Sequence, residues 1–110
     1  MESLKKRFKR LKRLKVYVAG KVSGLPREEV VANFARHAAY IRKAAGRKTN
    51  IVLPINLCRP DWSWWHCMKV CLPALHTCDA IYLMPNWRQS KGARIERLVA
   101  KYYGIKIVEA

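Results

Sequence analysis

The sequence predicts an α/β fold in which a short parallel sheet of about four strands lies between helices as a three-layer sandwich. Two observations lead to this prediction. Short apolar runs of strand length alternate along the chain with longer segments whose apolar residues recur every three or four positions. A strand, a helix and a second strand in succession form a right-handed crossover, which makes the two strands parallel. The 110 residues are a length typical of one domain.

The first half of the chain predicts a strand, a helix and a second strand. Residues 15–19 form the first apolar run, and residues 20–26 follow as a glycine-bearing turn. Pro26 is expected to start a helix that ends at Gly46, because the apolar residues between them recur at helical spacing. These residues are Val30, Phe34, Ala38, Ile41 and Ala45. The second strand is expected at residues 50–54.

Residues 55–65 form the least regular stretch and hold three tryptophans within four positions. Two interpretations are open: the rings line a pocket and stack on a nucleobase, or they pack as a cap on a small core. Asp61 is expected to cap the next helix, and a role as a second carboxylate of a site is the less favoured alternative. That helix is expected at residues 64–77, with Pro73 kinking or splitting it.

Four cysteines lie in and around this helix, at positions 58, 67, 71 and 78. No Cys-x-x-Cys pair is present, and one helix alone cannot supply the four ligands of a structural zinc site. We therefore expect buried, reduced thiols, no metal ion, no cofactor and a cytoplasmic protein. We expect neither a membrane span nor a secretory signal, because no apolar run has the required length.

The last third of the chain predicts two strands with a helix between them. An apolar run at residues 80–84 predicts the third strand, and residues 105–108 predict the fourth. Ser90 is a favourable N-cap for the intervening helix, and Gly104 is expected to end it. The apolar residues that recur at helical spacing in this helix are Ile95, Leu98, Val99 and Tyr102.

Glu96 is the candidate reactive residue of this last helix. No residue three or four positions away is basic, so the helix itself offers no ion-pair partner. Helical side chains lean toward the N-terminus, so Glu96 should overhang Gly92 and Ala93, which leave space before its carboxylate. The alternative is an exposed side chain, or one paired with an arginine from elsewhere. Asp79, at the amino end of the third strand, is expected to cap or pair rather than react.

Three loops should meet at the carboxyl ends of the strands, where open parallel sheets bind their ligands. They are residues 20–26, 54–65 and 85–92. In the first loop, glycines let backbone N–H groups approach an anion, and Lys21 and Ser23 can add to them. Its Gly-x-x-x-Gly spacing is neither a Walker loop nor the dinucleotide-binding fingerprint.

The chain carries 23 Lys and Arg against 7 Asp and Glu, and this net charge of +16 predicts attraction to phosphate groups. Residues 1–14 are a basic N-terminal segment that could form an amphipathic helix. It is interpreted either as an arm that binds nucleic acid or a membrane surface, or as a solvated leader, and we favour the leader. Residues 15–110 stay strongly basic and are expected to form the domain.

Two blocks of the sequence resemble the nucleoside 2-deoxyribosyltransferases and the related deoxynucleotide N-hydrolases. The first is VYVAG at residues 16–20, and the second begins with CDAIYL at residues 78–83. The second block continues through Trp87, Ser90, Gly92, Ala93 and Glu96. The similarity covers about residues 15–108 and is nearest to a phage and bacterial branch of that superfamily without an assigned activity. It implies a flavodoxin-like fold, a nucleoside or nucleotide ligand, and often a homodimer.

The resemblance also implies roles for single residues. Glu96 corresponds to the nucleophile that attacks C1′ of a 2-deoxyribosyl group, and Tyr17 to the tyrosine that positions it. Ser90 and Gly92 correspond to the loop that receives a 5′-phosphate or 5′-hydroxyl. The characterised enzymes carry a second carboxylate just before this loop, which helps the leaving base, whereas residues 84–88 contain no acid here.

The predicted site therefore has two catalytic and seven substrate-binding residues. The catalytic pair is Glu96 and Tyr17, and the binding residues are Gly20, Lys21, Ser23, Asn86, Trp87, Ser90 and Gly92. Three functions stay open: an N-glycosidase or deoxyribosyltransferase, a nucleotide binder without catalysis, and a nucleic-acid-associated protein that acts through its basic arm. Asn86 can hydrogen-bond a base but cannot protonate it at neutral pH, which favours the binder. Glu96, without a helical partner, favours the enzyme, and we place the enzyme first.

Overall fold

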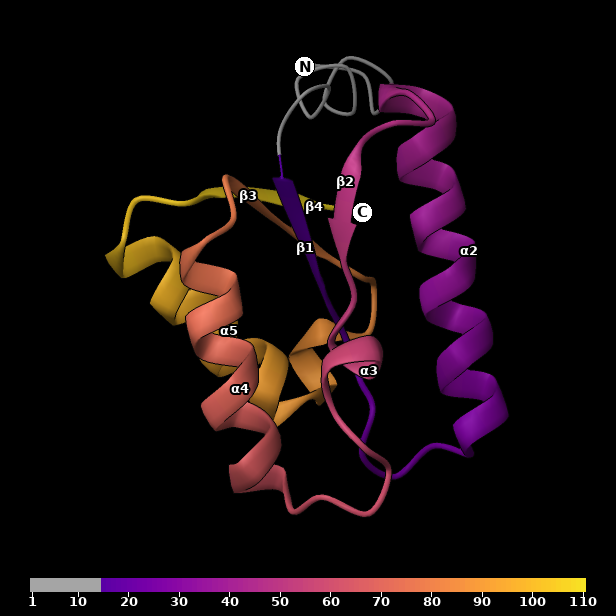
Figure 1. Cartoon of the computed structure of the whole chain (residues 1–110), viewed down its shortest axis with the longest axis vertical. Coiled ribbons are helices and arrows are strands. Elements are labelled where there is room, and N and C mark those ends of the chain that lie inside the picture. Colours follow the sequence, from indigo (N-terminus) through magenta and orange to yellow (C-terminus); the bar gives the residue numbers. More distant parts are fainter. Residues whose placement is uncertain (1–14) are drawn as a thin grey trace.

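The computed structural model describes residues 15–110 and shows an α/β fold in three layers (Figure 1). The central layer is one sheet of four strands in the order β2-β1-β3-β4, and every neighbouring pair is parallel. The strands are β1 (Lys15–Ala19), β2 (Asn50–Val52), β3 (Ala80–Leu83) and β4 (Lys106–Glu109). The predicted flavodoxin-like arrangement is confirmed. The helix expected within residues 1–14 lies outside the described part of the chain.

Strand β1 is at the centre of the molecule because it pairs with β2 on one side and β3 on the other. Successive side chains of a strand point to opposite faces of the sheet. Val16 and Val18 therefore join the core cluster on the side of α2 (Arg27–Ala45). Tyr17 and Ala19 join the cluster on the opposite side. This alternation points the Tyr17 side chain toward the helices that form the candidate site.

Helix α2 covers one face of the sheet, on the right in Figure 1. Its buried residues are Val30, Phe34, Ala38, Ile41 and Ala45. These are the residues of the predicted apolar stripe, which is confirmed. Gly46 ends the helix with a positive φ of 121°, which favours glycine, and its N–H donates to the carbonyl of Arg42.

The opposite face is covered by α4 (Trp64–His76) and α5 (Lys91–Tyr102), on the left in Figure 1. Two short helices accompany them: α3 (Pro54–Leu57), directly after β2, and the 3-10 helix η1 (Trp87–Gln89), directly after β3. Helix α3 lies where irregular chain was expected. It forms because Pro54 occupies its first turn, where the missing N–H costs nothing.

The expected N-cap of α4 is wrong. Its N-cap is Ser63 rather than Asp61, because the Ser63 hydroxyl accepts the backbone N–H of His66 at 3.1 Å. The Asp61 side chain is exposed and pairs with Arg59, at 3.4 Å between Oδ1 and Nε. Of the two alternatives for Pro73, the split is wrong, because α4 continues through this residue as one element.

The buried face of α5 also differs from the prediction. Its buried residues are Ala93, Glu96 and Ala100, whereas Leu98 is 61% exposed and Tyr102 is 84% exposed. The small residues let the helix approach the sheet closely, which leaves Leu98 and Tyr102 on the outer side and turns Glu96 inward. The predicted N-cap is confirmed, since the Ser90 hydroxyl accepts the backbone N–H of Ala93 at 3.1 Å.

Asp79 has the structural role that was expected. Its Oδ2 accepts the backbone N–H of Lys15 at 2.9 Å, which ties the start of β1 to the start of β3. The carboxylate thus lies at the amino ends of the strands, away from the loops that follow them. Among residues 15–110, no helix combines the length and the apolar character needed to cross a membrane.

Candidate functional site

A cavity of about 880 Å³ lies at the carboxyl end of the sheet. Its lining comes from the turn after β1, from the segment between β2 and the first turns of α4, and from the start of α5. These are the three loops that the sequence predicted to meet. The volume falls in the range of about 300–1,000 Å³ that is usual for small-molecule sites.

Glu96 lines this cavity from α5 and is only 5% exposed. Its Oε2 accepts a hydrogen bond from the Tyr17 hydroxyl, which reaches it from β1 below. No lysine or arginine within residues 15–110 forms an ion pair with it. The alternative interpretations of an exposed or arginine-paired side chain are therefore wrong.

Burial raises the pKa of Glu96 from 4.5 to about 7, and the hydrogen bond from Tyr17 lowers it in part. The same environment raises the pKa of Tyr17 well above 10, through burial first and the neighbouring Glu96 charge second. Tyr17 therefore remains a hydrogen-bond donor at all physiological pH values. Glu96 is present in both its protonated and its ionised form near neutral pH.

Basic side chains surround the carboxyl group. The lining residues that carry a positive charge are Lys21, Arg27, Arg59, Lys91 and Arg94, and among the described lining residues Glu96 is the only acid. The first turn of α5 adds the partial positive charge of a helix N-terminus. Together these groups give the cavity a positive potential that attracts anions, phosphate groups above all.

Three tryptophans line the same cavity: Trp62, Trp64 and Trp65. Trp65 is 67% exposed, so this ring does not pack down as a cap on the core. The Nζ atom of Lys91 lies 4.6 Å from the centre of the Trp64 ring, a cation–π distance. The interpretation of the rings as a pocket wall is confirmed. The Trp62 ring already stacks on His66 at 3.9 Å, so the exposed Trp65 ring is the surface open to a flat aromatic ligand.

The family comparison adds one finding to this geometry. Residues 14–109 match a family model described as a domain of unknown function, DUF4406. The chain belongs to the DUF4406 family. No match was found among curated proteins, and none was found among solved structures.

The DUF4406 domain brings five of the seven predicted binding residues to the cavity: Gly20, Lys21, Ser23, Ser90 and Gly92. Gly20 packs closely on the buried Met84, which would have to shift for an alanine, because an added Cβ would lie 2.0 Å from its Cε and 3.1 Å from its Cβ. Gly92 has more room. Its added Cβ would meet Trp64 and Met68 only at 3.5 Å, an ordinary contact.

Asn86 and Trp87 do not line the cavity. The Asn86 Oδ1 atom accepts the backbone N–H of Lys21 at 3.0 Å, so it holds the turn after β1 and occupies an N–H that an anion would otherwise use. The Trp87 indole donates to Glu109 Oε1 at 3.1 Å, and the Arg97 guanidinium lies 5.1 Å from the centre of its ring. Trp87 thus contacts β4 rather than the cavity.

The domain supplies no second carboxylate within the described lining. Asp61, the candidate substitute in the tryptophan loop, is exposed and lies outside the lining. The region before Ser90 contributes no acid either.

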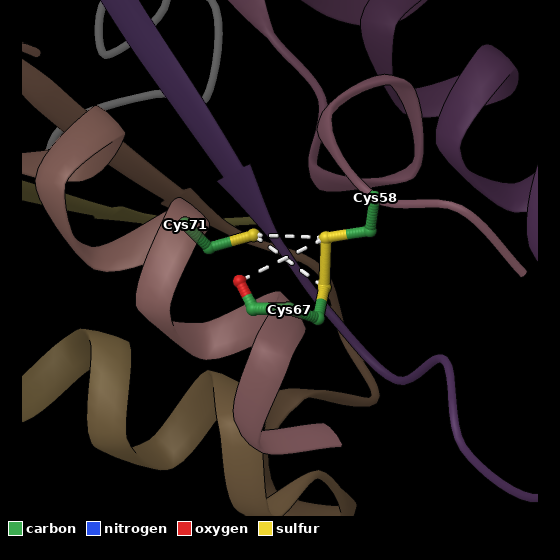
Figure 2. A group of neighbouring side chains, drawn as sticks. All are labelled: Cys58, Cys67 and Cys71. Carbon is green, nitrogen blue, oxygen red and sulfur yellow. Dashed lines mark hydrogen bonds between the residues drawn. A yellow bond between two sulfur atoms is a disulfide. The ribbon is translucent and has the colours of Figure 1, made fainter. Parts of the chain in front are cut away.

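The cysteines of the DUF4406 domain correct one expectation and confirm another. Cys58 and Cys67 form a disulfide instead of remaining reduced, whereas Cys71 and Cys78 are free, buried thiols (Figure 2). The disulfide forms because Cys58 directly follows α3, which brings its Cα within 5.5 Å of the Cys67 Cα in α4. Cys58, Cys67 and Cys71 line the cavity. The spacing of Cys67 and Cys71 by one helical turn was the only sign of this cluster in the sequence.

Proposed function

We propose that this DUF4406 domain binds a deoxynucleotide in the cavity and breaks or exchanges its N-glycosidic bond, with Glu96 as the nucleophile. The observation that carries the proposal is the buried Glu96 carboxyl on the cavity wall, hydrogen-bonded to Tyr17 and without a basic partner. Burying an ionisable carboxyl without a cation costs free energy. Such a position is typical of residues whose perturbed pKa serves chemistry.

The chemistry of the lining matches the three parts of a nucleotide. The basic side chains and the N-terminus of α5 suit the phosphate, and the exposed tryptophan faces suit the base. Glu96, buried in the wall of the same cavity, suits the sugar. The resemblance to deoxyribosyltransferases and deoxynucleotide N-hydrolases supports the same assignment.

In the proposed reaction, a carboxylate oxygen of Glu96 forms a bond to C1′ of the deoxyribosyl group. The bond from C1′ to the base nitrogen breaks, its electron pair stays with the base, and the base takes a proton from water. Water then hydrolyses the glycosyl ester to deoxyribose 5-phosphate and free Glu96, or a second base replaces the first. Tyr17 orients the carboxylate through its hydrogen bond and stabilises its ionised form.

A second candidate function is nucleotide binding without turnover. The observation that favours it is the missing second carboxylate in the described lining. General acid catalysis at a leaving group is worth about 10²–10⁴-fold in rate, so an enzyme without it would be slow. The basic rim and the tryptophan wall would serve this function equally well.

The deciding experiment incubates the protein with each deoxynucleoside monophosphate and measures free base by chromatography. Matched deoxynucleosides without phosphate and ribonucleotides serve as substrate controls. We expect slow base release from at least one deoxynucleotide, complete loss of release in Glu96→Ala, and weaker binding when Lys91 or Arg94 is replaced by alanine. Release that persists in Glu96→Ala would contradict the assigned nucleophile.

Thermal denaturation separates the two candidates. A deoxynucleotide that raises the melting temperature of wild type and of Glu96→Ala without base release supports the binder. No shift and no release with any nucleotide would exclude both candidates. Nucleic-acid binding would then be the remaining function, and deletion of residues 1–14 should lower the salt dependence of DNA affinity.

The resemblance also supports the proposal of a homodimer. The outward side of α5 and of its C-cap residue carries three large exposed side chains, Leu98 and Tyr102 in the helix and Tyr103 at the C-cap. A second copy of the chain that packs on this face would bury them. Light scattering at several concentrations tests this, and a monomer at every concentration would contradict it.

A further inference from the structure

We propose that the sulfurs of Cys58, Cys67 and Cys71, once the disulfide is reduced, form a binding site for a thiophilic divalent metal ion, Zn²⁺ in particular. The three cysteines line the same cavity as Glu96, and Cys71 lies beside Tyr17, but the inference uses the sulfurs alone and does not rest on the proposed function. A disulfide needs two cysteines, and the third sulfur beside it is the feature that requires an explanation (Figure 2).

The three sulfurs already lie close together, all within 4.8 Å of one another. The Cys71 sulfur is 3.5 Å from the Cys58 sulfur and 3.7 Å from the Cys67 sulfur. A tetrahedral zinc site with Zn–S bonds of about 2.3 Å places its sulfurs about 3.8 Å apart. Two of the three sulfur–sulfur separations therefore already match, and only the bonded pair has to move apart.

The backbone directs these three side chains toward one another. Cys67 and Cys71 lie one turn apart on the same side of α4, so both sulfurs project toward Cys58 (Figure 2). Cys58 comes from a separate element, the residue that caps the C-terminus of α3. One helix alone cannot supply a zinc site, but here α3 and α4 both contribute cysteine ligands.

The cavity can supply the fourth ligand of the metal ion and offset the net charge of the site. All three cysteines line the cavity, so water can take the fourth position, as in zinc sites with three protein ligands. Three thiolates and one Zn²⁺ leave a net charge of −1. The basic side chains on the same cavity wall offset that charge.

A dithiol reductant gives two electrons and two protons to the Cys58–Cys67 disulfide and becomes a disulfide itself, which leaves three thiols in the cluster. Zn²⁺ then displaces the three thiol protons and binds the three thiolates. Reoxidation of Cys58 and Cys67 removes two ligands, so the oxidised protein should not hold the metal.

The experiment titrates fully reduced protein with Co²⁺ under anaerobic conditions, followed by competition with Zn²⁺. We expect one equivalent of Co²⁺ to give sulfur-to-cobalt charge-transfer bands and the strong visible bands of tetrahedral cobalt, and Zn²⁺ to abolish them. The disulfide form, confirmed by its mass, should give neither signal. Reduced wild type without these bands, or equal binding by the oxidised form, would overturn the proposal.

Single variants identify the ligands. Cys71→Ser should weaken Zn²⁺ binding at least about 100-fold and reduce the charge-transfer intensity. Cys78→Ser is the matched control, because Cys78 is also a free, buried thiol near the end of α4 but lies outside the cluster. Equal losses in both variants would overturn the assignment. Circular dichroism confirms that each variant is folded, and if Cys71→Ser is not, the wild-type titration decides alone.

Discussion

Replacing Glu96 with glutamine should change how the stability of this protein depends on pH. The Glu96 carboxyl is 5% exposed and has Tyr17 as its hydrogen-bond donor. Burial penalises its ionised form, so the folded protein holds this proton more tightly than the unfolded chain does. Glutamine keeps the shape and an oxygen acceptor for Tyr17 but cannot ionise.

The size of the effect follows from the two pKa values of Glu96. Burial raises the pKa from 4.5 to about 7, and each pKa unit corresponds to about 1.4 kcal/mol, which gives about 3–4 kcal/mol in total. Because the folded-state pKa is the higher one, this stabilisation is fully present below about pH 4.5. It is lost progressively as the pH rises to about 7.

Urea denaturation at several pH values between about 4.5 and 8 measures the effect. The free energy of unfolding of wild type minus that of Glu96→Gln should fall by about 3 kcal/mol across this window. The two free thiols do not interfere, because burial raises the pKa of Cys71 and of Cys78 above 9. The measurements use the disulfide form of the protein with a chelator present, so the sulfur cluster stays oxidised and free of metal throughout.

Glu28→Gln is the matched control, since Glu28 is an exposed carboxylate in the first turn of α2. The pH dependence of its free energy of unfolding shows the effect of removing a carboxylate that is not buried. If the curves of wild type and Glu96→Gln run parallel within about 1 kcal/mol from pH 4.5 to 8, the carboxyl is solvated in solution. The assignment of Glu96 as a buried, reactive group would then fail.

Three further substitutions test the packing around the site. Tyr17→Phe removes the hydrogen bond that lowers the pKa of Glu96, so the Glu96 titration followed by carboxyl NMR should move to higher pH; an unchanged midpoint would count against that bond. Gly20→Ala should destabilise the protein by roughly 1–3 kcal/mol, since its Cβ would lie 2.0 Å from Cε and 3.1 Å from Cβ of Met84. Gly92→Ala, with 3.5 Å to its nearest neighbours, should change the free energy of unfolding by less than about 1 kcal/mol, and equal losses in both alanine variants would refute this packing account.

The order of strands and helices was predictable because it depends on local periodicity. The stripe of α2 shows this well, since each of its apolar residues at helical spacing is buried in the structure. The same reasoning failed for α5, where Leu98 and Tyr102 are exposed and Ala93 and Ala100 are buried. Periodicity finds large apolar residues, whereas the distance between a helix and its sheet decides whether small ones are buried instead.

The sequence by itself determined the α/β order of elements, the strong positive charge and the absence of a basic helical neighbour for Glu96. These are local or summed properties, so they need no coordinates. The family resemblance already paired Tyr17 with Glu96, but only the tertiary structure gave the hydrogen bond between them, across 79 positions, and brought Cys58 beside Cys67 and Cys71. Such long-range contacts depend on which faces of β1, α3, α4 and α5 pack together. That packing is set by the whole core rather than by any one segment.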